Sequence, residues 1–203
     1  MSALETENVA ASTGQHSGGA GRRFVALVVL LAMAGLIGLF ARGLAKPGQT
    51  PGGVAVNTQL GEVEIRSGPA RPFELTLFDG TALTLDELRG QVVMVDFWAS
   101  WCPPCRAEAP SLARVYREYR GKGVEFVGIA IWDTAEGARN YVQQFGVTYP
   151  SGLDPKGRLA MDYGVTGIPE KYFISRDGTL VKKFNGPMDE AGLKQVLDEL
   201  LAE

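Results

Sequence analysis

The pattern of apolar and polar residues after position 69 predicts strands and helices in alternation. FELTLF (73–78) and TALTL (81–85) flank Asp79-Gly80 and predict a β-hairpin, followed by a helical turn over 86–90. The segment QVVMVDFWAS (91–100) is almost continuously apolar, as in a strand buried on both faces of a sheet. Such a strand requires helices on both sides.

The rest of the chain supplies these helices and further strands. Apolar residues at helical spacing predict a helix from Pro104 to Tyr119, and a second helix is expected from Ala135 to Phe145. The apolar run over 124–132 predicts a second buried strand, and 170–175 with 179–184 an antiparallel hairpin. A last helix is expected over 189–201, with Asp189 as its N-cap. This order predicts an α/β fold with a mixed sheet flanked by helices.

An apolar segment near the N-terminus contains 18 residues without a charge, from Phe24 to Ala41. It is long enough for a transmembrane helix and longer than the apolar core of a signal peptide. We therefore expect an uncleaved membrane anchor over 22–42, after a disordered tail over 1–21. The alternatives are a signal peptide cleaved near 43–45, a twin-arginine export signal at Arg22–Arg23, and a buried core helix.

Basic residues flank this segment evenly, two on each side, but Arg22–Arg23 adjoin it directly. The positive-inside rule therefore favours an N-terminus inside the cell and a following domain on the extracytoplasmic side of the cell membrane. Residues 43–68 begin with a Gly/Pro-rich stretch typical of a linker, and the part over 54–68 suits an edge strand or extended chain. The folded domain is expected over 69–203.

Composition narrows the classes of function. The chain has 203 residues, of which 45% are hydrophobic and 21% charged, as in a folded globular protein. The net charge is −3 and no basic cluster is present, so we expect no nucleic-acid partner. The two cysteines are Cys102 and Cys105, and the one histidine is His16. Because a structural zinc site takes four such ligands and a cysteine protease needs an imidazole near its thiol, neither is expected.

Cys102 and Cys105 form a C-x-x-C motif where the buried strand turns into the first helix of the domain. A cysteine pair in this context is typical of thioredoxin-like redox sites. Free N–H groups and the helix dipole at a helix N-terminus favour a thiolate, so Cys102 is the expected attacking thiol. Cys105 is expected to be more buried and to resolve the mixed disulfide. Two ordinary buried cysteines are the alternative.

Several motifs together resemble one family. The segment VMVDFWASWCPPCRAEAP (93–110) resembles the thioredoxin active-site strand and helix, especially in membrane-anchored thiol-disulfide oxidoreductases of the CcmG/DsbE, ResA and TlpA type. Glu108 matches the C-x-x-C-x-x-E pattern of that group, and YGVTGIPE (163–170) matches the segment that carries its cis-proline. The resemblance covers 69–203. It implies a thioredoxin-like fold, a redox-active Cys102–Cys105 disulfide and a cis bond before Pro169, and we expect no cofactor.

The resemblance also suggests roles for individual residues. Asp96 matches the buried acid that relays a proton to the resolving thiol, although an aspartate held by nearby backbone is the alternative. Glu108 is expected to tune the thiols from the same helix face, or to be a solvated helix residue. With Pro169 these residues complete the predicted catalytic set. The expected substrate contacts are Trp101, Pro103, Pro104, Ile168 and Glu170. Glu170 is equally explained as a charge at the end of a hairpin.

The function implied is a tethered monomeric reductase that takes electrons from a membrane thiol carrier and reduces disulfides of exported proteins, among them apocytochrome c. Pro103 and Pro104 lack N–H groups, and Glu108 adds negative charge. Because both features disfavour a Cys102 thiolate, they predict a reductant. An oxidase or isomerase direction stays open. A peroxiredoxin-like peroxidase would need Thr or Ser where Ala99 stands, and a copper-delivery protein of the Sco type would need a histidine after the cysteines.

Overall fold

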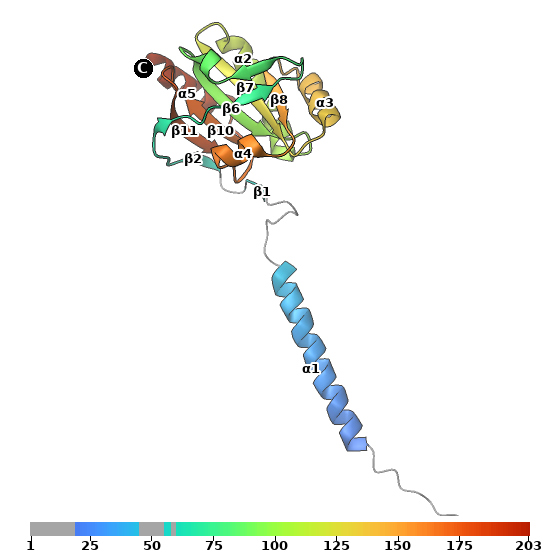
Figure 1. The fold of residues 1–203 in the computed structure, drawn as a ribbon. Helices are drawn as coiled ribbons and strands as arrows, with labels where there is room; N and C mark the ends of the chain where they lie inside the picture. The colour runs from blue at the N-terminus through green and yellow to red at the C-terminus, as the bar shows by residue number, and fades with distance from the viewer. Residues whose placement is uncertain (1–18, 45–54, 58–59) are drawn as a thin grey trace, which may run out of the picture. The chain divides into compact units, whose positions relative to one another are not determined.

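The computed structural model describes residues 19–44, 55–57 and 60–203. The chain divides into two units, Met1–Pro47 and Gly48–Glu203. The first contains helix α1 (Gly19–Leu44) and the second an α/β domain (Figure 1). Most of the predicted tail, His16 and a large part of the predicted linker lie outside the described residues.

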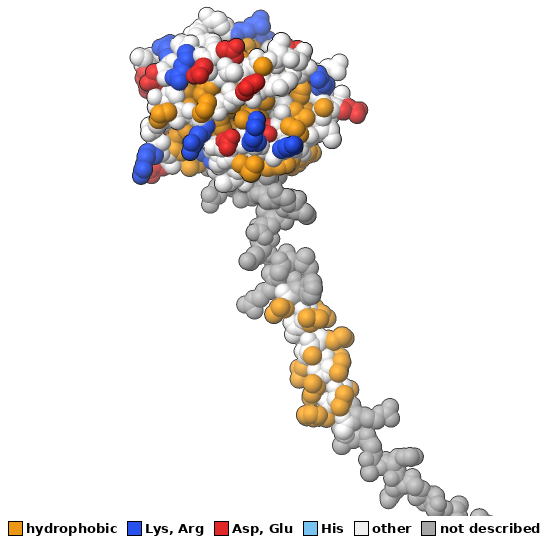
Figure 2. Space-filling view, viewed as in Figure 1, with side chains coloured by type: hydrophobic (Ala, Val, Ile, Leu, Met, Phe, Trp, Pro, Cys, Tyr) orange, Lys and Arg blue, Asp and Glu red, His pale blue; other side chains and the backbone are white. Residues whose placement is uncertain are grey.

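Helix α1 covers the apolar segment of the sequence. Its large apolar side chains are exposed, from Phe24 at 69% to Leu39 at 75%, and they follow the described length of the helix in Figure 2. As far as the structure describes them, none of the helices combines the length and apolarity that crossing a membrane requires. The predicted transmembrane helix is therefore not confirmed.

The domain is built on a mixed sheet with the strand order β2-β11-β10-β6-β7-β8. The central strand β6 (Val92–Trp98) has seven buried residues, which confirms the predicted strand with two covered faces. It runs parallel to β7 (Val124–Ile131) and antiparallel to β10 (Glu170–Ile174). The edge strands are β2 (Gly61–Val63) and β8 (Ser151–Asp154), and β11 (Thr179–Asn185) lies between β2 and β10 and also pairs with β3 (Gly68–Pro69).

The helices of the domain begin and end largely where the sequence predicts. α2 (Pro103–Tyr119) packs against β7 and against α5 (Glu190–Ala202), which in turn packs on β6. α3 (Ala135–Phe145) also contacts α2 and ends at Gly146, whose φ of 61° suits glycine. Asp189 caps α5 by accepting the Gly192 N–H at 2.7 Å, as predicted. The sheet and α2 thereby place the C-x-x-C motif at the carboxyl end of β6.

The predicted hairpin before β6 is also present. It consists of β4 (Glu74–Thr76) and β5 (Ala82–Thr84), and the helical turn after it is the 3-10 helix η1 (Asp86–Leu88). The sequence did not predict β8, α4 (Arg158–Tyr163) or β9 (Gly167–Ile168). The edge strand β2 and the segment β1 (Ala55–Val56), which pairs with β9, lie within 54–68, where an edge strand or extended chain was expected. These elements are short, and β8 depends on Gly152, where a Cβ atom would collide with the Thr76 carbonyl oxygen.

Candidate active site

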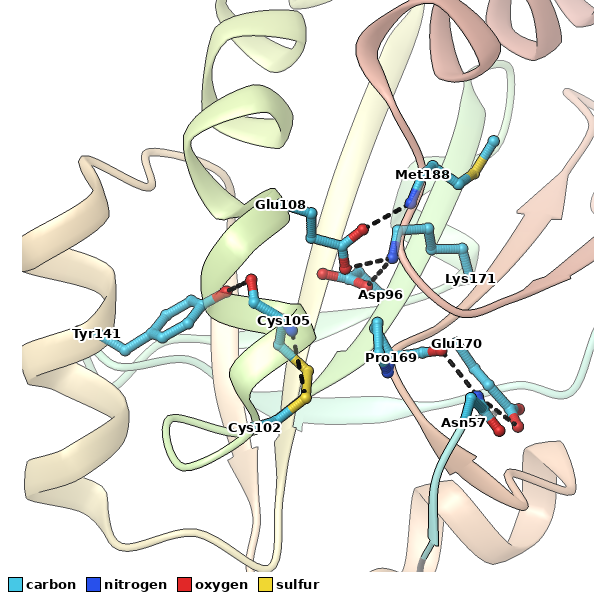
Figure 3. A network of polar contacts seen from close by, with 10 residues as sticks. All are labelled: Asn57, Asp96, Cys102, Cys105, Glu108, Tyr141, Pro169, Glu170, Lys171 and Met188. Atoms are coloured by element: carbon cyan, nitrogen blue, oxygen red, sulfur yellow. Dashed lines mark hydrogen bonds and ion pairs between the residues drawn. A yellow bond between two sulfur atoms is a disulfide. The ribbon is translucent and has the colours of Figure 1, made fainter. Parts of the chain in front are cut away.

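The two cysteines lie at the start of α2 (Figure 3). Cys102 is the N-cap residue of α2 and is joined to Cys105 by a disulfide. Because Pro103 and Pro104 have no N–H group, Cys105 provides the first helical N–H, which points at the Cys102 sulfur from 3.3 Å. The same N–H can stabilise a Cys102 thiolate after reduction.

Burial does not distinguish the two cysteines. Both residues are 0% exposed, so the predicted greater burial of Cys105 is not observed. Trp101, by contrast, is 47% exposed at the rim of the site, where a partner can reach it. Its indole N–H donates to the Trp132 carbonyl at 3.1 Å. The Tyr141 hydroxyl of α3 donates to the Cys105 carbonyl at 2.9 Å, so neighbouring elements hold both sides of the motif.

Three buried charged side chains meet beside α2: Asp96 of β6, Glu108 of α2 and Lys171 of β10. Asp96 and Lys171 lie directly opposite each other in the antiparallel register of β6 and β10. The Lys171 ammonium is 3.2 Å from Asp96 Oδ1 and 2.6 Å from Glu108 Oε1. The second Glu108 oxygen accepts the Met188 N–H at 2.9 Å. The interpretation of Glu108 as a solvated helix residue is therefore wrong. Asp96 is paired with a lysine instead of being held by nearby backbone.

One ammonium ion cannot fully compensate two buried carboxylates. Burial raises the pKa of Asp96, although Lys171 opposes this. Burial, opposed by Lys171 and reinforced by Asp96, raises the pKa of Glu108 to about 7. Burial lowers the pKa of Lys171, but the two carboxylates outweigh it and leave this pKa above its usual value. The cluster can therefore hold or release a proton near neutral pH while the lysine stays charged.

The segment before β10 approaches the same site. The Ile168–Pro169 peptide bond is cis, which confirms the expectation from the resemblance. Glu170 pairs with Phe97 near the end of β6, so Pro169 lies where β6 leads into the turn that carries Cys102. Figure 3 shows Pro169 next to the disulfide in this view.

Two predicted substrate contacts need correction. The Glu170 side chain is 0% exposed. Its Oε1 accepts the N–H groups of Thr166 and Gly167, both at 3.1 Å, and its Oε2 accepts the Tyr172 hydroxyl at 2.8 Å and lies 2.8 Å from Lys183 Nζ. A carboxylate held in this way is neither a surface charge nor a direct partner contact. Ile168 is also 0% exposed, and its carbonyl accepts the Asn57 N–H at 3.1 Å, so in this structure it is not open to a partner.

Sequence reasoning missed Lys171, Tyr141 and Asn57. Lys171 carried a usable signal, because a lysine in a buried strand needs a counter-charge and Asp96 is a second charge in a buried strand. Tyr141 gave none, since aromatic residues on an amphipathic helix are common. Asn57 gave none either, because its partners, the carbonyls of Ile168 and Pro169, are backbone groups.

This arrangement is suited to dithiol–disulfide exchange. In the reduced state a Cys102 thiolate attacks a partner disulfide, forms a mixed disulfide and releases one partner thiolate. Cys105, with a carboxylate of the cluster as proton acceptor, then attacks the Cys102 sulfur. This step releases the second partner thiolate and restores the Cys102–Cys105 disulfide, so two electrons pass to the partner. Fold and site together define a thioredoxin-like thiol-disulfide oxidoreductase.

Comparison with known proteins agrees with this class. The model of the Redoxin family matches residues 66–198, more than half of the chain, and the chain therefore belongs to that family. The thiol:disulfide interchange protein HelX of Rhodobacter capsulatus is 31% identical over 176 residues, which are 85% of this chain and 93% of HelX. The thiol-disulfide oxidoreductase ResA of Bacillus subtilis is 31% identical over 132 residues, 64% of this chain and 74% of ResA.

A solved structure shows the same fold. The crystal structure of a putative thiol:disulfide interchange protein DsbE from Chlorobium tepidum matches with a TM-score of 0.64 and 30% identity. It covers 68% of this chain and 99% of that protein. The part of this chain that resembles these enzymes therefore contains the disulfide and the buried cluster.

Proposed function

We propose that this oxidoreductase is a membrane-tethered reductase of disulfides in exported proteins, with apocytochrome c as its substrate and its Redoxin domain on the extracytoplasmic side. The observation that carries the reductase direction is the helix start at Cys102. Pro103 and Pro104 contribute no donors, and the Cys105 N–H is 3.3 Å from the Cys102 sulfur. A thiolate with few donors makes the reduced form less stable and the potential more negative.

The sequence argument from Glu108 contributes less than expected. A full negative charge near the thiols would also oppose a thiolate. In the structure, however, Lys171 lies 2.6 Å from Glu108, and the pKa of Glu108 is raised to about 7, chiefly by burial. The Lys171 ammonium offsets the negative charge of an ionised Glu108, and the raised pKa leaves part of the carboxyl protonated at neutral pH. The direction therefore depends mainly on the two prolines and on the resemblance to envelope reductases.

The redox potential of the full-length protein, measured by equilibration with glutathione and dithiothreitol, tests this direction. We expect a value near that of thioredoxin, about −270 mV, and a value above about −180 mV would contradict a reductase. Pro104→Ala restores one N–H at the helix start and should raise the potential by about 20 mV at most. Pro155→Ala, in an exposed turn after β8, is the matched control and should leave the potential unchanged.

Apocytochrome c is proposed from the resemblance to enzymes of cytochrome c maturation. Its haem-attachment motif, C-x-x-C-H, supplies a vicinal cysteine pair that oxidises to a disulfide. The rate at which the reduced protein reduces oxidised apocytochrome c should exceed its rate on an unrelated exported disulfide protein. Equal rates would contradict the substrate assignment and leave the reductase assignment standing.

The tether is proposed from the uncharged segment Phe24–Ala41 and from the apolar side chains that α1 exposes. An apolar helix surface of this kind favours an apolar environment. In a Gram-negative host, the full chain should stay in the membrane pellet after alkaline carbonate extraction, and external protease should reach the domain in spheroplasts. Recovery of a soluble form that begins after Ala45 would show a cleaved signal peptide instead.

A further inference from the structure

A short segment that precedes the sheet is paired with the strand next to the disulfide. β1 runs parallel to β9, with Ala55 opposite Gly167 and Val56 opposite Ile168. The following Asn57 N–H donates to the Ile168 carbonyl at 3.1 Å, and the Asn57 carboxamide donates to the Pro169 carbonyl at 2.9 Å. In the view of Figure 3, Pro169 lies between Asn57 and the disulfide.

The edge of β9 is the place where a partner chain would be held for exchange. Among the described residues, β9 pairs with β1 alone, so without residues 55–57 its backbone groups would be open to an extended chain. Such an edge binds extended polypeptide through main-chain hydrogen bonds. A chain on β9 runs past Pro169, and therefore past the turn that carries Cys102. In this structure residues 55–57 already occupy that place, and Cys102 is 0% exposed.

We propose that residues 55–57 form a displaceable strap on β9, whose place an extended cysteine-containing segment of the partner protein takes during disulfide exchange. The strap lowers the rate at which polypeptide partners reach Cys102. This inference needs the thiol-disulfide activity of the pair, but it depends neither on the identity of the exported substrate nor on the membrane tether.

The strap is short and depends on Asn57. β1 contains two residues, and Asn57 adds the two hydrogen bonds to the carbonyls of Ile168 and Pro169. The Asn57 carboxamide also lies 3.5 Å from Glu170 Oε1, at the limit of a hydrogen bond. So few contacts allow release, because a partner chain on the same edge can replace the main-chain bonds that the strap gives up.

The test compares two reductants of the oxidised full-length protein, with the intrinsic tryptophan fluorescence of the protein as the readout. One is a short synthetic dithiol peptide, which needs the β9 edge, and the other is dithiothreitol, which is too small to need it. Asn57→Ala removes the side-chain donor, and Asn57→Pro removes the backbone N–H as well. We expect the peptide rate to rise about fivefold for each hydrogen bond lost, equivalent to about 1 kcal/mol, and the dithiothreitol rate to rise much less.

Two variants separate the strap from indirect effects. Thr166→Val removes a hydroxyl bond to Glu170 Oε1 of 3.0 Å without altering residues 55–57, and Asn140→Ala removes an exposed asparagine of α3. Both should show wild-type rates with both reductants. Acceleration by Thr166→Val equal to that by Asn57→Ala would assign the effect to Glu170 and overturn the proposal. An unchanged or lower peptide rate in Asn57→Ala would overturn it as well.

A measurement with residues 55–57 unaltered makes the test independent of whether Asn57→Pro folds. In Cys105→Ser a single-cysteine version of the peptide, supplied as its mixed disulfide with a small thiol, can be trapped on Cys102, which displaces the small thiol. Hydrogen exchange followed by mass spectrometry should then show faster exchange at the Asn57 amide than in the variant without peptide. Continued protection of this amide in the trapped complex would show that the strap is not displaced.

Discussion

Replacing Glu108 by glutamine tests the buried cluster quantitatively. The pKa of Glu108 is raised by burial to about 7 in the folded protein, against an ordinary value of 4.5. A difference of about 2.5 pH units, at 1.36 kcal/mol per unit, means that ionising Glu108 costs the folded state about 3 kcal/mol relative to the unfolded chain.

The sign follows from the raised pKa. Below about pH 4.5 the carboxyl is protonated in both states, so this group does not change stability with pH. Between about 4.5 and 7 the unfolded chain loses the proton first, and the free energy of unfolding of the wild type falls. Above about 7 this loss is complete. The glutamine side chain does not titrate. The free energy of unfolding of Glu108→Gln, relative to that of the wild type, should therefore rise by about 3 kcal/mol between pH 4.5 and 8.

The assay is urea unfolding of both oxidised proteins at a series of pH values. Contributions that Glu108 does not share cancel in the difference between the two proteins. Glu87→Gln is a control of opposite sign, because hydrogen bonds from the Thr84 backbone and hydroxyl lower the pKa of Glu87. Its stability relative to the wild type should fall with rising pH. A difference for Glu108→Gln that stays constant with pH, or falls, would refute the account of the cluster.

Three further predictions concern the neighbours of the disulfide. Burial raises the pKa of Asp96, and Asp96→Asn removes this proton acceptor, so disulfide exchange should slow at neutral pH while the fold is retained. Stopped-flow rates that match the wild type from about pH 6 to 9 would show that Asp96 is purely structural. Lys171→Met leaves two buried carboxylates without a cation and should lower the free energy of unfolding by about 3–5 kcal/mol at high pH, but by less at low pH, where the carboxylates are protonated. Urea unfolding that shows an equal loss at both pH values would contradict this. Tyr141→Phe removes the hydrogen bond to the Cys105 carbonyl and should lower the free energy of unfolding by about 0.5–1.5 kcal/mol, measured by thermal or urea unfolding. The pH profile of disulfide exchange should stay unchanged, and a shifted profile would give Tyr141 a role in the chemistry.

Local pattern was enough to predict the elements that carry the cysteines. The apolar run of β6 and the helical spacing of α2 are properties of consecutive residues, and the C-x-x-C motif marks their junction. Asp96 and Glu108 were also identified, one as a charge in a buried strand and one by its place in the motif. Their common partner was not, because Lys171 meets Asp96 only through the register of β6 with a distant strand.

Glu170 shows a limit of the same kind. A glutamate at the start of a hairpin suggests an exposed charge, and both interpretations from the sequence assumed one. Its burial depends on donors from the preceding loop, from Tyr172 and from Lys183, which only the folded chain brings together. The pairing of β1 with β9 was equally inaccessible, since strands of two residues leave no recognisable periodicity.

The assignment of Cys102 as the attacking thiol and Cys105 as the resolving thiol is the central claim, and a trapping experiment tests it most directly. The reduced Cys105→Ser and Cys102→Ser variants are each mixed with a C-x-x-S-H peptide whose one cysteine is held in a mixed disulfide with a small thiol, and the products are identified by mass spectrometry under non-reducing conditions. Because Cys102 is the N-cap residue that faces the Cys105 N–H, we predict that a stable mixed disulfide accumulates through Cys102 in Cys105→Ser and that Cys102→Ser forms little. A mixed disulfide that forms mainly through Cys105 in Cys102→Ser would contradict the account.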